Sequence, residues 1–380
     1  MKKSFIFLLG IVFLAIIVIS TWKIREKNED DGGDFEEKIW NQRIDAALSL
    51  NECTSIKWKR YGELYYDGPL IDSHYHIPNL PDYPPGEPEP ANTEMRPFLG
   101  SNIEISDIVC TLKQENTMKV FAFFPVFPNE DWQYIEVAKR TMDLYPDLFV
   151  PFIMPPDNDN SINGHPTVEA KVLDKMLNKY PNLFEGYGEI GLYARQGGAE
   201  ALAPDSERLL DIYPVIKENN LIVYFHLGEA HQESFEGILE QNPDINFIWH
   251  GDQLISKNSG KQNLQHIEEI ISRHSNVYYT IDELYGDEWM LRPEVTKGQF
   301  LAHLENYEVL LERDLADWKH IIEKYPNQFL WGTDRSPQVL WSHDVEVGQA
   351  LTNYGRAFIA RLDINVQENF AYKNAERLLK

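Results

Sequence analysis

The feature that most constrains this chain is a regular alternation of short apolar runs with longer amphipathic segments. Eight of the runs are typical of buried strands: residues 69–76, 119–125, 149–154, 185–192, 221–226, 245–250, 277–281 and 329–334. Strands that are almost continuously apolar and alternate with helices are characteristic of parallel sheets buried on both faces. Eight such units predict an α/β fold of the (β/α)8, or TIM-barrel, type, with an open doubly wound sheet as the alternative.

The segments between the predicted strands have the spacing of apolar residues that favours helices. We expect helices over residues 105–116, 130–144, 167–180, 205–219, 232–241, 262–274, 311–325, 345–361 and 366–379. Two long segments interrupt this pattern, a Pro-rich loop over 78–97 and an insertion over 282–306, and the loop is a candidate lid or specificity element. No Gly-x-Gly-x-x-Gly sequence follows the first strand, so a dinucleotide-binding fold is not predicted.

The first 27 residues differ from the rest of the chain. Lys2 and Lys3 precede an apolar run from Phe5 to Ile19, and basic residues follow it within 23–27. This pattern is typical of a signal peptide or a signal-anchor helix, although the run is shorter than the roughly 20 residues that span a bilayer comfortably. We therefore expect the remainder of the protein outside the cytoplasm, secreted or membrane-anchored, in the periplasm or at the cell surface.

Residues 28–68 predict a linker and an N-terminal extension, because an acidic, glycine-containing stretch precedes a short helix expected over 35–50. The barrel domain is then expected over 69–380. Cys53 and Cys110 are the only cysteines, and they could pair in an oxidising compartment or be two unrelated thiols. Their separation excludes a Cys-x-x-Cys metal site.

Composition narrows the classes of function. The 380 residues are 43% hydrophobic, which suits a large globular core, and they carry a formal net charge of −25 at pH 7. Nucleic acids and anionic membrane surfaces are recognised by basic patches, so a nucleic-acid partner is not expected. We expect a small-molecule substrate, and membrane contact only through an uncleaved N-terminal segment; the sequence does not indicate an oligomeric state.

Polar residues of a particular kind end several predicted strands. Four of the 11 histidines follow apolar runs, together with two carboxylates: His74, His76, Glu189, His226, His250 and Asp334. In a strand, residues i and i+2 point to the same side, so His74 and His76 present two imidazoles to one face. Because the carboxyl ends of barrel strands meet at one face, we expect the six side chains to converge there. The alternative is that His226 and His250 are buried core residues and that Asp334 is a helix N-cap.

Imidazoles and carboxylates in this combination are the ligands of a divalent cation, and we expect zinc, as one or two ions. A cation with an open coordination position makes water reactive near neutral pH by lowering its pKa. Asp334 could then accept the proton of the water and pass it to the leaving group. His250 could polarise the scissile carbonyl or stabilise its oxyanion.

These motifs resemble the metal-dependent amidohydrolase superfamily, and within it the amidohydrolase-related (amidohydrolase 2-like) branch. The resemblance rests on Ile-Asp-Ser-His-Tyr-His at 71–76, the single histidines of the fifth and sixth strands, and Gly-Thr-Asp at 332–334. It extends over residues 69–380 and includes the last predicted helix. It implies that the metal ligands are His74, His76, His226 and Asp334, and that His250 is a second-metal ligand or an electrophilic assistant.

Glu189 decides between one and two ions in this interpretation. Some members of the superfamily bridge two metals with a carboxylate of the fourth strand, and Gly-Glu-Ile-Gly-Leu at 188–192 also resembles the corresponding motif of metal-dependent deoxyribonucleases. No lysine stands at the end of this strand, so a carboxylated lysine is not expected. Glu189 is therefore a candidate metal ligand, with an ion pair to an arginine as the alternative.

The resemblance implies a metal-dependent hydrolase that cleaves an amide, lactone or ester bond of a small molecule. Two alternatives are a metal-dependent non-oxidative decarboxylase of an aromatic or unsaturated acid, and a non-catalytic surface module that uses the barrel for binding. For the decarboxylase, Arg195 or Arg335 could hold the acid group, although an exposed ion pair is an equal expectation for each. His231, Trp341 and His343 are further candidates for substrate contact.

Overall fold

The structure of the protein is a computed structural model. It describes residues 37–49, 52–53, 60–81, 88, 98–126, 132–159, 161, 164–193, 201–228, 231–251, 260–282, 284, 294–335 and 339–379. The predicted N-terminal segment over 1–27 lies outside these ranges. Among the helices that are described, none combines the length and the apolar character needed to cross a membrane.

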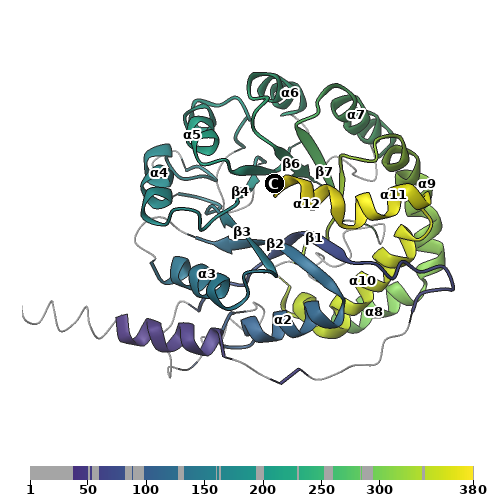
Figure 1. The fold of residues 1–380 in the computed structure, drawn as a ribbon, viewed down its shortest axis with the longest axis horizontal. Helices are drawn as coiled ribbons and strands as arrows, with labels where there is room; N and C mark the ends of the chain where they lie inside the picture. The colour runs from purple at the N-terminus through teal and green to yellow at the C-terminus, as the bar shows by residue number, and fades with distance from the viewer. Residues whose placement is uncertain are drawn as a thin grey trace, which may run out of the picture.

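Eight parallel strands form the centre of the molecule (Figure 1). They are β1 (Leu70–His76), β2 (Thr117–Pro125), β3 (Phe149–Met154), β4 (Gly186–Gly191), β5 (Ile222–His226), β6 (Phe247–His250), β7 (Val277–Ile281) and β8 (Phe329–Trp331). Their order in the sheet is their order in the chain, β1 to β8. An open doubly wound sheet reverses its strand order at a switch point, so that alternative is wrong.

The sheet comes close to a closed barrel where its first and last strands meet. A parallel bridge joins Tyr75 of β1 to Arg335, which lies just beyond β8. Two backbone hydrogen bonds strengthen this junction: Asp334 N–H donates to the His74 carbonyl at 3.1 Å, and His76 N–H donates to the Arg335 carbonyl at 3.3 Å. The contact between the first and last strands therefore also brings Asp334 beside the two histidines of β1.

Helices surround the strands on the outside (Figure 1). They are α2 (Ile105–Gln114), α3 (Trp132–Leu144), α4 (Ala170–Lys179), α5 (Glu207–Glu218), α6 (Gln232–Gln241), α7 (Gly260–Arg273), α8 (Lys297–Glu305), α9 (Tyr307–Lys324) and α10 (Val345–Ile359). Another helix covers 37–47, within the predicted range of 35–50. The predicted insertion over 282–306 contains α8, and the helix predicted to begin at 311 begins at Tyr307.

Both faces of each strand are buried, which explains why the strands are almost continuously apolar. In β2, Phe121 and Phe123 belong to the cluster inside the barrel, whereas Val120 and Phe124 belong to the layer between strands and helices. This alternation follows from the two-residue period of a strand. The interior is therefore filled by side chains, as in other eight-stranded barrels, and does not form a pore.

The C-terminal segment closes one end of the barrel. The helix predicted over 366–379 is divided into α11 (Ile364–Glu368), the π-helical turn η4 (Asn369–Lys373) and α12 (Asn374–Leu378). Leu378 packs on the interior cluster, and the Asn374 side chain donates to the Phe329 carbonyl at the start of β8, at 2.7 Å. Figure 1 shows the C-terminus over the centre of the strand ring. The opposite end, where the strands terminate, holds the polar residues described below.

A disulfide joins Cys53 to Cys110, across 57 positions of sequence. It connects the N-terminal extension to α2, and the two cysteines are therefore partners and not unrelated thiols.

Candidate metal centre

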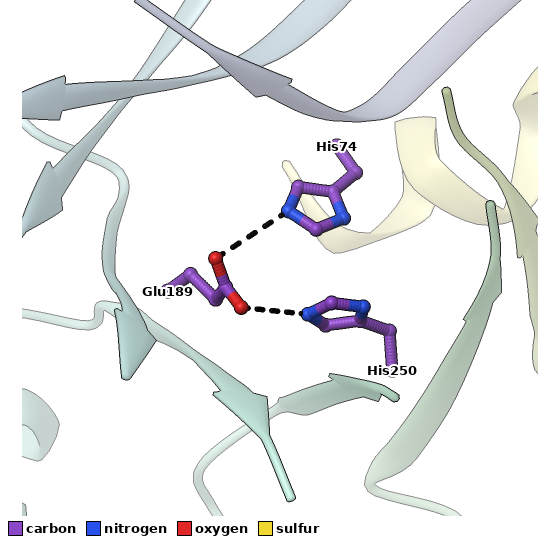
Figure 2. A group of neighbouring side chains, drawn as sticks. All are labelled: His74, Glu189 and His250. Atoms are coloured by element: carbon purple, nitrogen blue, oxygen red, sulfur yellow. Dashed lines mark hydrogen bonds and ion pairs between the residues drawn. The ribbon is translucent and has the colours of Figure 1, made fainter. Parts of the chain in front are cut away.

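The barrel brings the six predicted side chains to one place. His74 and His76 lie in β1, Glu189 in β4, His226 and His250 at the ends of β5 and β6, and Asp334 three residues after β8. All are buried except Asp334, whose side chain is 21% exposed. Figure 2 shows how His74 and His250 face Glu189 from different strands.

Three of these residues form a compact triangle of donor atoms. Nε2 of His74 and Nε2 of His76 are 3.1 Å apart, and Asp334 Oδ1 lies 3.3 Å from the first and 3.2 Å from the second. A tetrahedral ion with bonds of roughly 2.0–2.1 Å holds its ligand atoms about 3.3 Å apart. The triangle thus fits one face of a tetrahedral site for a cation such as zinc.

Glu189 lies between two pairs of imidazoles. Its Oε1 is 2.6 Å from His226 Nδ1 and 2.9 Å from His250 Nε2. Its Oε2 is 3.3 Å from His76 Nε2 and 3.7 Å from His74 Nε2. One oxygen therefore faces the β1 triangle and the other faces the histidines of β5 and β6, an arrangement in which a carboxylate can bridge two ions.

Asp282, which directly follows β7, is a member of the cluster that the sequence reasoning missed. It is buried, and its Oδ2 lies 2.6 Å from His74 Nδ1 and 3.1 Å from His250 Nδ1. The rule that found the other residues would have found it, since it is the first polar residue after the apolar run 277–281. It is also the first residue of the predicted insertion over 282–306, which hides this signal.

Charge pairing dominates the electrostatics of the cluster. Burial disfavours a charged His74, but Asp334 and Asp282 outweigh burial and raise its pKa to about 9. Burial likewise opposes the charge of His250, yet Asp282 and Glu189 raise its pKa well above the usual value. Burial would raise the pKa of Glu189, but His250 in particular holds it well below its ordinary value. Without a cation, protons on imidazoles therefore balance the carboxylates, and metal binding has to displace them.

Asp72 explains how the end of β8 is held against β1. It is buried and accepts hydrogen bonds from the Thr333 N–H at 3.0 Å, the Thr333 hydroxyl at 2.5 Å and the His74 N–H at 3.1 Å. Asp334, which follows Thr333, has a φ of 43°, so the chain turns sharply where it enters the cluster. Asp72 thus positions a histidine and an aspartate that are distant in sequence.

Gly188 explains how Glu189 reaches the cluster. The register of β4 with β5 shifts between Tyr187 and Ile190, around the glutamate. Gly188 has a φ of 140°, and a Cβ there would lie 2.3 Å from the Tyr224 carbonyl oxygen. Only glycine permits this close approach of the two strands without displacement of the backbone.

Two of the suggested substrate contacts have other partners. Arg335 is fully buried, and its Nη2 is 2.7 Å from both oxygens of Glu115. Its guanidinium also lies over the Tyr75 ring, 5.2 Å from the centroid. His343 is buried behind β1, with Nδ1 3.1 Å from the Tyr75 hydroxyl, and burial lowers its pKa to about 3. Neither is placed to hold a substrate acid group, and Arg195 lies outside the described residues.

The remaining suggestions concern the surroundings of the cluster. Trp341 packs on Phe300, with ring centroids 5.2 Å apart. His231 lies at the start of α6, near Gly228, which follows β5 closely. The Tyr193 ring lies 4.4 Å from the ring of His226, centroid to centroid, so it covers one side of the cluster. Most of the predicted loop over 78–97 lies outside the described residues.

No protein-family model and no curated protein matches this sequence. Solved structures do match. An amidohydrolase from Burkholderia multivorans with bound Hepes gives a TM-score of 0.52 at 10% identity, over 82% of this chain and 99% of that chain. A zinc-bound crystal form described under the same name gives 0.48 at 10% identity, over 82% and 99%. A 2,6-dihydroxybenzoate decarboxylase from Rhizobium gives 0.42 at 15% identity, over 82% and 98%.

The first of these matches shows that the chain shares its barrel fold with that solved structure. That fold is the one expected from the motifs at 71–76 and 332–334.

Proposed function

We propose that this protein is a metal-dependent hydrolase of small molecules, acting on an amide, lactone or ester bond. The observation that carries the proposal is the triangle formed by the Nε2 atoms of His74 and His76 and Oδ1 of Asp334, with sides of 3.1–3.3 Å. A divalent cation held there would supply Lewis-acid polarisation and lower the pKa of water.

Two ions are proposed, with zinc as the expected metal. His74, His76 and Asp334 would hold the first ion, and His226 and His250 the second. Glu189 would contribute one oxygen to each, because its Oε1 faces His226 and His250 while its Oε2 faces the β1 histidines. Nitrogen and carboxylate donors of this kind suit zinc, which accepts both.

The chain's own groups suggest how protons would be handled. Asp334 is the most exposed member of the set, at 21%, so it is the carboxylate best placed to meet an incoming substrate. It would accept the proton of the attacking water and return it to the leaving group. His250 has Nε2 on Glu189 and Nδ1 on Asp282, which favours a ligand role over that of a free electrophilic assistant.

The test is a substrate panel measured with and without metal. Purified protein is stripped with a chelator, reloaded with zinc, and assayed on a lactone, an amide, an ester and an aromatic acid. We expect hydrolysis that disappears on stripping and returns on reloading. Hydrolysis that survives complete metal removal would reject the proposal. Carbon dioxide release from the acid would favour the decarboxylase, and tight metal binding without any turnover would favour a binding module.

An extracytoplasmic location is proposed as well, for a secreted or membrane-anchored enzyme. The disulfide between Cys53 and Cys110 supports it, because such bonds persist in oxidising compartments. Cell fractionation, with thiol alkylation before and after reduction, tests it. Protein recovered in the cytosolic fraction with both cysteines alkylated before reduction would contradict it.

A further inference from the structure

We propose that Asp282 is a positioning residue shared by both halves of the metal centre, orienting His74 in one half and His250 in the other. This inference rests on the proposed function, because it assumes that the histidines hold cations. Asp282 itself would bind no ion. It would couple the two sites, so that its loss weakens both together.

Asp282 contacts both histidines through the same carboxylate oxygen. A single oxygen, Oδ2, lies 2.6 Å from His74 Nδ1 and 3.1 Å from His250 Nδ1. The carboxylate accepts, so each Nδ1 carries the proton that it donates. When metal binding displaces the proton on Nε2, each imidazole is left in the tautomer whose Nε2 has a free lone pair, which is the form that binds a metal.

The Nε2 atoms of the two histidines point toward the proposed metal sites. Nε2 of His74 is directed at the triangle with His76 and Asp334, and Nε2 of His250 is directed at Glu189. Asp282 and Glu189 thus engage opposite edges of the same two rings. Any movement of the Asp282 carboxylate would turn both rings, because both depend on one oxygen.

Asp282 and the two histidine rings lie in a buried, closely packed environment. Asp282 is 3% exposed and His74 is 0% exposed. The His74 ring packs edge-on against Phe123, with centroids 5.2 Å apart, and lies 5.1 Å from the Tyr224 ring. The His250 ring is 5.6 Å from the same tyrosine. Packing limits tilting of the rings, and the carboxylate fixes their remaining rotation.

The other two histidines lack this arrangement. His226 directs its Nδ1 at Glu189, so that atom is its own candidate ligand. His76 Nδ1 is buried and has no hydrogen-bond partner within the described part of the chain. Each half of the centre therefore contains one histidine oriented by Asp282 and one that is not, which is why the effect of Asp282 should be equal on both halves.

The experiment measures metal affinity and does not depend on activity. Wild type, Asp282→Asn and Asp282→Ala are stripped and titrated with zinc against a chromophoric chelator. We expect two equivalents in the wild type, and in both variants a loss of about 10–100-fold in affinity for each equivalent. His226→Ala should weaken only one equivalent. Asp314→Asn is the matched control, because Asp314 is buried in α9 and accepts from Tyr354 at 2.6 Å, away from the cluster.

Asparagine preserves the volume of Asp282, so Asp282→Asn carries the test if the alanine variant does not fold. Cobalt loading gives a second readout: the absorption spectrum should change for the Asp282 variants and stay unchanged for Asp314→Asn. Wild type with two tight equivalents and unaltered affinity in Asp282→Asn would overturn this inference while leaving the proposed function intact. So would weakening of one equivalent alone. Absence of metal binding in the wild type would overturn both.

Discussion

Removal of the negative charge of Glu115 should destabilise the folded protein strongly. Both oxygens of Glu115 lie 2.7 Å from Nη2 of Arg335, and both side chains are fully buried. Gly348 leaves the space for this pair, since a Cβ there would lie 2.1 Å from Glu115 Oε1. Loss of one partner leaves an uncompensated buried charge, which costs about 3–5 kcal/mol. For a domain with roughly 5–15 kcal/mol of unfolding free energy, that is a large fraction.

The assay is urea denaturation of Glu115→Gln, with the slope checked against wild type so that midpoints can be compared. Asp244→Asn is the exposed control, because Asp244 pairs with Lys217 at 2.6 Å on the surface, with side chains 66% and 59% exposed. It should cost at most about 1 kcal/mol. The double variant Glu115→Leu with Arg335→Met should recover most of the loss. A loss below about 1 kcal/mol in Glu115→Gln would refute the reasoning.

Three further predictions concern the site and the extension. Asp334→Asn should lower kcat by about 10²–10⁴-fold with an unchanged unfolding midpoint, measured on whichever panel substrate is hydrolysed; retained kcat would remove its proposed role. Because the pKa of His74 is raised to about 9, the metal-free imidazole is protonated at pH 7. Zinc binding should therefore release protons and tighten as pH rises toward 9, whereas calorimetry showing no proton release would disagree. Cys53 and Cys110 are 57 residues apart, so reduction of their disulfide should lower the free energy of unfolding by about 4 kcal/mol, measured by denaturation. An unchanged midpoint would show that the disulfide contributes little to stability.

The barrel was predictable because strand burial leaves a direct mark on the sequence. A strand covered on both faces must be apolar along its length, and eight such runs separated by helical segments fit few folds. The ends of the elements leave a weaker mark on the sequence. The eighth strand was predicted to reach 334 but ends at Trp331. Gly332 passes so close to Thr280 that a Cβ would lie 2.7 Å from its Cγ2, and the chain then turns at Asp334, whose φ is 43°. Apolar patterning carries no signal of that turn.

The site was predictable to the extent that each residue ends a strand. The rule is harder to apply where a strand runs directly into an insertion: Asp282 follows an apolar run, but it is also the first residue of the insertion over 282–306. It fails for Arg335, whose partner Glu115 lies 220 positions away and is paired with it only by the fold. The sequence alone does not distinguish an arginine that faces a substrate at a strand end from one held in a buried ion pair. The fold has to show which residue it contacts.

The most direct test of the metal centre is a diffraction experiment at the zinc absorption edge on crystals of the zinc-loaded protein. We expect an anomalous peak within roughly 2.0–2.2 Å of Nε2 of His74 and His76 and Oδ1 of Asp334, and a second between His226 and His250. Peaks only at other sites, or none in protein that is active, would contradict this prediction.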